Sequence, residues 1–153
     1  MIKTSILLML FLLISCGTTQ PIKQFGNDFS PELQDDVFEF LADCQRHLHT
    51  HKCNQLILLT VKVQKLPEPD QLGVCYTYYS PNEHVRNIYI DPSIVGTAQQ
   101  KLVVYHELAH CIFEMDHYDT KVDIMNSYTY EQKALWIYDN WDFFLKAMFS
   151  RIP

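Results

Sequence analysis

The residues of this sequence best suited to chemistry lie between positions 106 and 117, where three histidines and three acids stand among apolar residues. His106 and His110 are four residues apart, and Glu107 directly follows the first of them. On a helix, that spacing places two side chains on one face, one turn apart. Two neutral imidazoles so placed can bind a transition-metal ion, and ring nitrogens hold Zn²⁺ at about 2.0–2.1 Å. The segment is therefore a candidate metal site.

A catalytic zinc site has three protein ligands and one open position, so the histidine pair predicts a third ligand nearby. His117 lies seven residues after His110, and Asp116 immediately precedes it. Because imidazole is the commoner ligand for transition metals, we take His117 as the third ligand and Asp116 as the alternative. Glu131 is a more distant candidate, although an acid in the first turn of a helix is already favoured by the helix dipole.

The histidine pair needs a helix to position it, and the sequence signals one. Thr97 and Gln100 form a capping box, in which two side chains three residues apart satisfy free backbone N–H groups at a helix start. Apolar residues follow at helical spacing as far as Ala109. A second capping box, at Thr129 and Gln132, predicts a C-terminal helix that reaches Met148.

The segments upstream of this helix predict a small sheet. Ser30 and Pro31 are typical of a helix start, and the apolar spacing that follows predicts a first helix over residues 31–49. Runs of β-branched and apolar residues, separated by prolines, predict strands at 56–63, 72–79 and 85–91. The order of helix, strands, helix, loop and helix predicts an α+β domain with a small mixed sheet packed against helices.

The site residues resemble those of known enzymes. His106 to His110 read HELAH, which is the HExxH pattern of zinc metallopeptidases. Residues 123–126, read DIMN, fit the methionine-containing turn that follows this pattern in the metzincin clan. Residues 85–130 therefore resemble a metzincin, and the C-terminal helix would follow the turn.

The resemblance implies a role for each of these residues. Glu107 would be the general base that takes a proton from a metal-activated water, and Met125 would lie beneath the metal. Tyr128 or Tyr130 would contact the metal or the developing oxyanion. The strand at 85–91 would pair with an extended peptide substrate. The zinc ligands would be His106, His110 and His117.

The chain departs from the clan's extended pattern, HExxHxxGxxH, at one point. Phe113 stands where the clan has glycine, and His117 comes one residue later than the third histidine. Counted strictly, the third-ligand position falls on Asp116. Glycine lets the helix end in a left-handed turn, which Phe113 cannot adopt cheaply. We expect the extra residue to make the same reversal in a wider loop.

A different class of function would use the same metal. In a lipid-anchored binding or structural module, zinc would only clamp the helix to the following loop, and Asp116 or Glu114 would close the fourth position. His47 and His51 are also four residues apart and form a weaker candidate for a second metal site.

The N-terminal residues predict export. Residues 1–15 combine one lysine, an apolar run and small residues, as secretory signals do. Leu13 to Cys16 resemble the lipobox of bacterial lipoproteins, which implies that Cys16 is acylated and anchors the protein in the cell envelope. Gly17 after the cysteine resembles lipoproteins of the outer membrane. Residues 16–29 would form a tether and residues 30–153 the domain; the alternative is an ordinary secretion signal that contains a cysteine.

Charge and cysteine content limit the partners and the compartment. The formal net charge of −6 argues against nucleic acid as a partner. The resemblance to metallopeptidases implies a peptide or protein substrate, and we expect a monomer. Four cysteines follow the predicted signal, and an oxidising compartment allows them to pair in three ways. We favour Cys44 with Cys53, because that pair would close a short loop after the first helix.

Overall fold

The computed structural model describes residues 28–48, 53, 59–79, 84–119, 121–127 and 131–152. The predicted signal peptide, Cys16 and all of the predicted tether except its last two residues lie outside this part. Its helices and strands follow the predicted α+β order, which is confirmed. No helix within the described residues is both long enough and apolar enough to cross a membrane.

The sheet has four strands in the order β1–β2–β4–β3. They are β1 (Asp28–Phe29), β2 (Leu59–Val63), β3 (Gly73–Tyr79) and β4 (His84–Ile90). The first three in this order are mutually parallel, whereas β3 lies antiparallel to β4 at the edge. The sheet is therefore mixed, as predicted. Asp28 and Phe29, which were expected in the tether, form a strand of the sheet, so the folded part includes these two residues.

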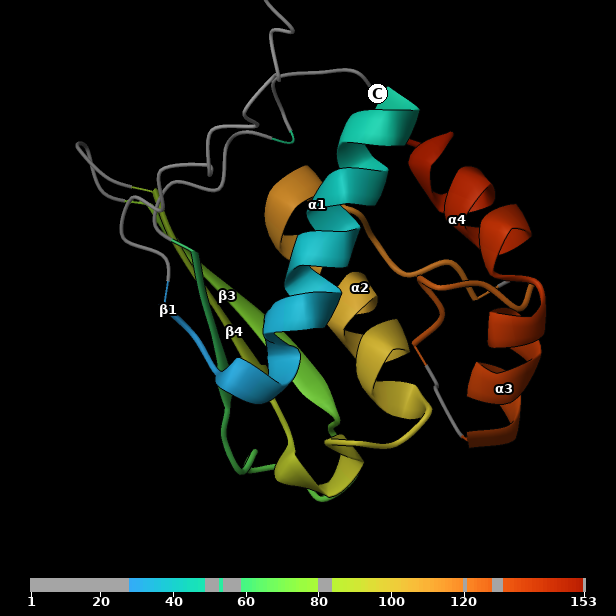
Figure 1. Cartoon of the computed structure of the whole chain (residues 1–153). Helices are drawn as coiled ribbons and strands as arrows, with labels where there is room; N and C mark the ends of the chain where they lie inside the picture. The colour runs from blue at the N-terminus through green and yellow to red at the C-terminus, as the bar shows by residue number, and fades with distance from the viewer. Residues whose placement is uncertain are drawn as a thin grey trace, which may run out of the picture.

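The helices lie on one side of the sheet (Figure 1). Helix α1 (Gln34–Leu48) and helix α2 (Gln99–Phe113) pack against each other, and α2 also contacts β3 and β4. Helices α3 (Glu131–Asp139) and α4 (Trp141–Phe149) lie on the side of α2 away from the sheet (Figure 1). Two short 3-10 helices, η1 (Pro31–Leu33) and η3 (Pro92–Ile94), precede α1 and α2.

Helix α2 is the centre of the hydrophobic core. Ten of its fifteen residues are buried, because β3 and β4 pack on one side and α1 and α3 pack on others. A helix enclosed in this way carries apolar residues all round rather than on one stripe. Ile88 and Ile90 of β4 and Leu59 and Val61 of β2 complete the core beneath it. The residues from 106 to 110 thus sit on the most firmly held element of the fold.

Two disulfides join the elements of the domain. Cys44–Cys53 joins α1 to the segment that follows it, which confirms the favoured pairing, and Cys75–Cys111 links β3 to α2. The second bridge spans 36 residues. In the chain-entropy picture, a closed loop of that length stabilises the fold by about 3–4 kcal/mol. It fixes the edge strand against the helix that carries the histidine pair.

The first helix begins differently from the prediction. Its first turn is the 3-10 helix η1, and the Ser30 hydroxyl does not cap it. Instead, the Ser30 Oγ accepts a hydrogen bond of 3.0 Å from the Val63 N–H, at the end of β2. The hydroxyl therefore satisfies a strand donor, a role that local sequence does not reveal.

The predicted C-terminal helix is two helices, α3 and α4, that meet at Asn140. The Asn140 side-chain amide donates to the Trp136 carbonyl at 3.0 Å, and Asn140 leaves helical geometry with φ −126° and ψ 30°. Asparagine side chains compete for backbone partners in this way and so favour helix ends.

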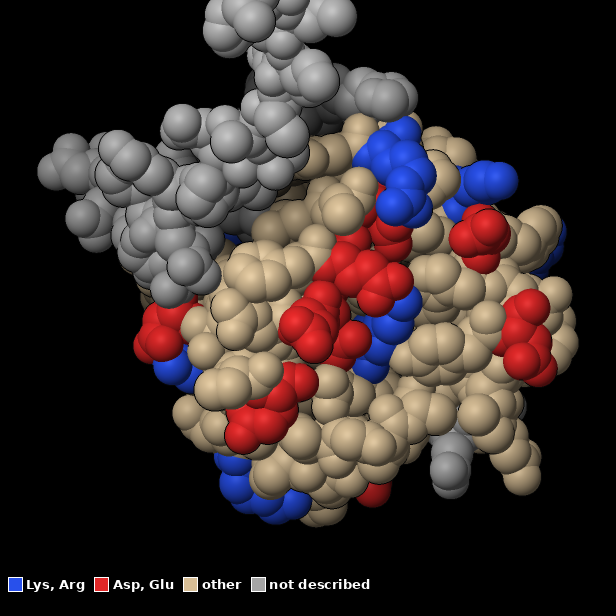
Figure 2. Space-filling view, viewed as in Figure 1, with Lys and Arg blue, Asp and Glu red and all other residues tan. Residues whose placement is uncertain are grey.

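Acidic side chains gather along α1 on the face shown in Figure 2. Lys101 of α2 offsets part of this charge, with its Nζ 2.5 Å from the Glu39 carboxylate. The same ammonium group lies 4.6 Å from the centroid of the Trp141 ring. This partly exposed ion pair contributes about 0–1 kcal/mol, so it shapes the surface more than it stabilises the fold.

Candidate metal centre

Three histidines converge at the C-terminal part of α2. The Nε2 atom of His106 lies 2.9 Å from that of His110 and 3.2 Å from that of His117. In a tetrahedral zinc site, two nitrogens each about 2.0–2.1 Å from the metal are about 3.3 Å apart. Among the described residues, these three form a group that could hold a metal ion.

The hydrogen bonds of the Nδ1 atoms set the tautomers of His106 and His110. His106 Nδ1 donates to the Ile124 carbonyl at 2.8 Å, and His110 Nδ1 donates to the Met115 carbonyl at 2.5 Å. A carbonyl only accepts, so each Nδ1 carries the proton and each Nε2 of a neutral ring presents a lone pair. Lone pairs that face each other at 2.9 Å repel. A shared cation removes that repulsion, and carbonyl-oriented imidazoles are typical of metal sites.

Burial keeps these rings neutral. His106 is 8% exposed, and burial lowers its pKa to about 4. Burial also lowers the pKa of His110 below its ordinary value. Because a metal binds the neutral imidazole, burial favours His106 and His110 in the form that metal binding requires.

The turn after α2 brings His117 back to the pair. Glu114 takes the left-handed conformation, with φ 55° and ψ 35°, and its N–H bonds to the His110 carbonyl at 3.1 Å. A non-glycine residue in this conformation costs about 1–2 kcal/mol. The third histidine lies three residues beyond Glu114, which is the separation of glycine and histidine in the extended clan pattern. The extra residue therefore lengthens the helix through Phe113, and the expected wider loop is wrong.

The turn around Met125 packs beside His106 and contacts its ring through a backbone carbonyl. Ile124 and Met125 are fully buried, and the Met125 N–H bonds to the Asp123 carboxylate at 2.9 Å. The Ile124 carbonyl is the group that orients the His106 ring. The turn predicted from the sequence thus contacts the histidine group through a backbone oxygen.

Glu107 faces the same region from α2 without joining the histidine group. It is 7% exposed, and burial raises its pKa to about 8. It lines an open cavity of about 540 Å³ together with His110, His117 and residues of β3. A carboxyl group with a pKa near neutral can take up and release protons at working pH.

Gly73 of β3 makes room for Glu107. A Cβ added at Gly73 would come 2.7 Å from the Glu107 Cγ and 2.8 Å from its Oε1. The strand can therefore approach α2 this closely only without a side chain at position 73. Sequence reasoning missed this role, although an isolated glycine within a predicted strand is a signal of close backbone approach.

The strand beside the cavity is β3, and not the predicted strand at 85–91. That segment forms β4, which is hydrogen-bonded to β2 on one side and β3 on the other. It has no free edge for a peptide. Strand β3 is an edge strand, and Gly73, Val74, Cys75 and Thr77 line the cavity.

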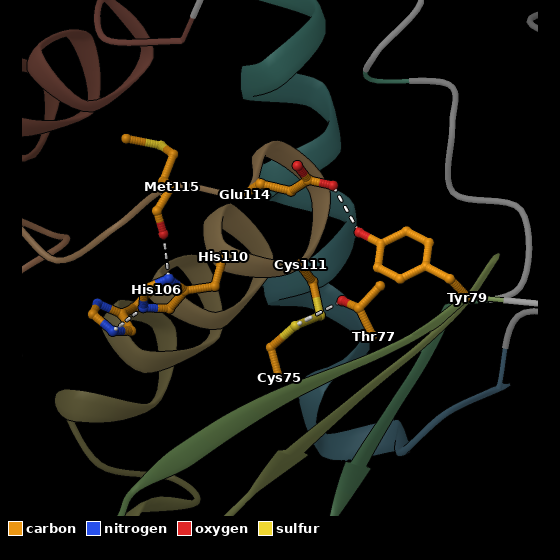
Figure 3. The surroundings of a disulfide bond; sticks show 8 residues. All are labelled: Cys75, Thr77, Tyr79, His106, His110, Cys111, Glu114 and Met115. Atoms are coloured by element: carbon orange, nitrogen blue, oxygen red, sulfur yellow. Dashed lines mark hydrogen bonds between the residues drawn. A yellow bond between two sulfur atoms is a disulfide. The ribbon is translucent and has the colours of Figure 1, made fainter.

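Two links hold β3 in this place (Figure 3). The Cys75–Cys111 disulfide joins the strand to the residue after His110. Beyond it, the Tyr79 hydroxyl donates to the Glu114 carboxylate at 2.8 Å. Both links depend on how a strand and a helix pack, so the sequence alone did not reveal them.

The remaining candidate site residues lie apart from the histidine group or outside the described part of the chain. Asp116 is exposed and is not a member of the histidine group, while the His47 ring stacks on Phe149 with centroids 5.4 Å apart. Four candidates lie outside what the structure describes: Tyr128, Tyr130, His51 and the side chain of Glu131.

No protein-family model, curated protein sequence or solved structure matches this chain. The chemistry of the site is therefore judged from its own geometry.

Proposed function

We propose that this protein is a zinc-dependent, metzincin-like metallopeptidase. The observation that carries the proposal is the convergence of three imidazole Nε2 atoms, two with their Nδ1 bonded to carbonyls, beside a buried carboxyl group in an open cavity. Imidazole sets also suit copper, nickel and iron, but three nitrogens with one open position are typical of catalytic zinc. Zinc held there supplies an electrophile that polarises a peptide carbonyl and acidifies water.

Glu107 would act as the proton carrier. It lies one residue from His106, faces the cavity and is not a member of the histidine group, so its carboxyl group is available for proton transfer. The positive charge of a bound metal would favour its ionised form, which is the form that accepts a proton. It would take a proton from the attacking water and pass it to the leaving amine. Gly73 would keep the carboxylate in reach by leaving space at its Cγ and Oε1.

An extended peptide would lie along β3, which is at the edge of the sheet formed by the described strands. Edge strands bind peptides by adding a strand through main-chain hydrogen bonds. The β3 edge borders the cavity that Glu107 and two of the histidines line. A peptide paired there would pass beside the metal centre, which supports peptides or unfolded protein segments as the substrate class.

The structural-module alternative has less support. Its fourth zinc ligand would have to be Glu114 or Asp116. The Glu114 carboxylate instead accepts the Tyr79 hydroxyl, and neither acid belongs to the histidine group. The alternative would leave Glu107 without a chemical role.

We also propose that the protein is exported and anchored through Cys16 in a bacterial cell envelope. The resemblance of residues 13–16 to a lipobox supports this location, and so do two disulfides, which persist in oxidising compartments.

Cleavage of a diverse peptide mixture tests the proposed function. The purified protein loaded with Zn²⁺ should cut peptides, and mass spectrometry of the products would identify the cleaved bonds. A chelator should stop cleavage, and added Zn²⁺ should restore it. Zinc-loaded protein that cuts no peptide in the mixture would contradict the proposal.

Replacing Gly73 by alanine should impair catalysis while leaving metal binding intact. The new Cβ would meet Glu107 and the Val103 Cγ1 at 2.7 Å each and would displace them by about 1 Å to reach ordinary contact distance. A misplacement of Glu107 by that amount can cost about 10²-fold in rate. We expect kcat for a cleaved peptide to fall by about that factor, with zinc content unchanged.

Tyr76→Phe is the control for this substitution, because Tyr76 belongs to the same strand, points to the opposite face from Gly73 and does not line the cavity. It should change kcat far less than Gly73→Ala. A Gly73→Ala protein with ordinary kcat would show that the strand does not position Glu107.

A further inference from the structure

The buried carboxylate of Asp123 pairs with a residue that is not part of the histidine group. The Arg151 guanidinium, which follows α4, binds it through two hydrogen bonds of 2.6 and 2.9 Å. Asp123 is 4% exposed, whereas the Arg151 side chain is 28% exposed, so only the carboxylate end of this pair is buried. Arginine binds a carboxylate through two parallel N–H groups, which fixes orientation as well as distance.

The same carboxylate shapes the turn that supports His106. Asp123 Oδ1 accepts the Met125 N–H at 2.9 Å, and the Asp123 carbonyl accepts the Asn126 N–H at 3.3 Å. These bonds hold the turn in the form that aims the Ile124 carbonyl at His106 Nδ1, 2.8 Å away. Any shift of the Asp123 carboxylate would therefore move the group that orients a metal ligand.

Arg151 also reaches the segment that carries His117. Its guanidinium carbon lies 4.5 Å from the centroid of the Tyr118 ring, a cation–π contact. The Tyr118 N–H bonds to the Met125 carbonyl at 2.7 Å, which ties this segment to the turn. One side chain thus contacts both the turn behind His106 and the residue after His117.

From these contacts we infer that Arg151 is a positioning residue of the metal centre, acting through Asp123 and Tyr118. It fixes the position of the Ile124 carbonyl, which orients His106, relative to the backbone next to His117. The Nε2 atoms of these two histidines therefore remain 3.2 Å apart. The inference rests on the proposed metal centre, but it concerns a residue that lies 34 positions beyond His117 in the chain. Nothing in the HExxH pattern points to it.

Zinc affinity of the purified protein tests this role. Partners that orient metal ligands typically contribute about 10–100-fold to affinity. Arg151→Met should weaken Zn²⁺ binding, measured by competition with a chromogenic chelator, by a factor in that range. Arg151→Lys should recover only part of the loss, because an ammonium group cannot make the paired hydrogen bonds or stack on Tyr118 in the same way.

The Co²⁺-loaded protein gives a second readout. Arg151→Met should change the position and intensity of the visible absorption bands, which report the geometry of the ligands. A residue that only stabilises the fold would leave those bands unchanged in the fraction that stays folded. Far-UV circular dichroism would establish that the variant remains folded.

Arg46→Met is the matched control. Arg46 also pairs with a buried aspartate, Asp43, through an N···O distance of 2.6 Å, but it lies on α1. Arg46→Met should leave Zn²⁺ affinity and the Co²⁺ bands unchanged. Equal Zn²⁺ affinity in Arg151→Met and wild type, or an equal loss in Arg46→Met, would overturn the inference. Wild-type protein that binds no Zn²⁺ would overturn the metal centre itself, which is a distinguishable result.

Discussion

Glu107→Gln protein is expected to bind zinc as wild type does and to lose about 10²–10⁴-fold in kcat for peptide hydrolysis, the usual contribution of a general acid–base residue. Glutamine has the size of glutamate, so it fits the space beside Gly73. Its amide cannot take a proton from water at neutral pH. Chemistry should therefore fail while the metal centre stays in place.

The arrangement around Glu107 makes this separation of effects possible. The carboxyl group is buried against β3, whereas the converging nitrogens belong to three histidines. Zinc content by atomic absorption and kcat on a peptide identified from the mixture are the two measurements. Neither depends on knowing the natural substrate.

Glu114→Gln is the control for Glu107→Gln. Glu114 is the other carboxylate of the cavity, but it is exposed and bonded to Tyr79. We expect its kcat to remain within a few-fold of wild type, since it has no part in proton transfer. Unchanged kcat in Glu107→Gln would remove Glu107 from the mechanism, and loss of zinc in that variant would make it a ligand instead.

His117→Ala protein is expected to lose more than about 100-fold in zinc affinity. Removing a group that merely orients a ligand costs about 10–100-fold, and a ligand itself should cost more. His117 is the exposed member of the three, so alanine there leaves no buried cavity and little change in stability. The loss should therefore appear in metal binding, measured by chelator competition, and not in thermal unfolding of the metal-free protein.

Asp116→Ala decides between the two third ligands considered from the sequence. It should bind zinc as wild type does, because the structure places the His117 Nε2, and not the Asp116 carboxylate, in the converging group. The reverse pattern, with zinc lost in Asp116→Ala and kept in His117→Ala, would assign the third position to the aspartate.

Local sequence patterns predicted most of what lies within one helix or turn. The spacing of His106 and His110 and the capping signal at Thr97 both act over a few residues, and the structure places the pair on one helix face. The predicted capping box does not form: the residue that caps the helix is Ala98, without a side-chain bond, and the Gln100 amide oxygen accepts the Gly96 N–H. The Thr97 hydroxyl still accepts the Gln99 N–H at 3.2 Å, so the helix begins where the signal indicated. Short-range geometry of this kind leaves few alternatives, so it can be predicted from spacing alone.

The end of α2 differs from what the clan pattern predicted. Phe113 occupies the glycine position of the clan pattern, and the sequence suggested a wider loop. The helix instead continues through Phe113, and Glu114 adopts the left-handed conformation one residue later. The cost of about 1–2 kcal/mol is small beside the burial of α2, so the packing of the helix decides where it ends.

Features that join distant segments could not be predicted. Which strand forms the edge depends on the pairing of β3 with β4 and of β4 with β2, and a run of apolar residues does not encode that order. Gly73 against Glu107, Cys75 with Cys111 and Arg151 with Asp123 all follow from packing between elements. These contacts, which the HExxH pattern does not indicate, place the histidines in a cavity beside the edge strand β3.

X-ray absorption at the zinc K-edge of the purified, zinc-loaded protein tests the metal centre most directly. We expect one zinc per chain, with three imidazole nitrogens at about 2.0–2.1 Å and one exchangeable oxygen from water. A shell closed by four protein ligands, or one with fewer than three imidazoles, would contradict the account.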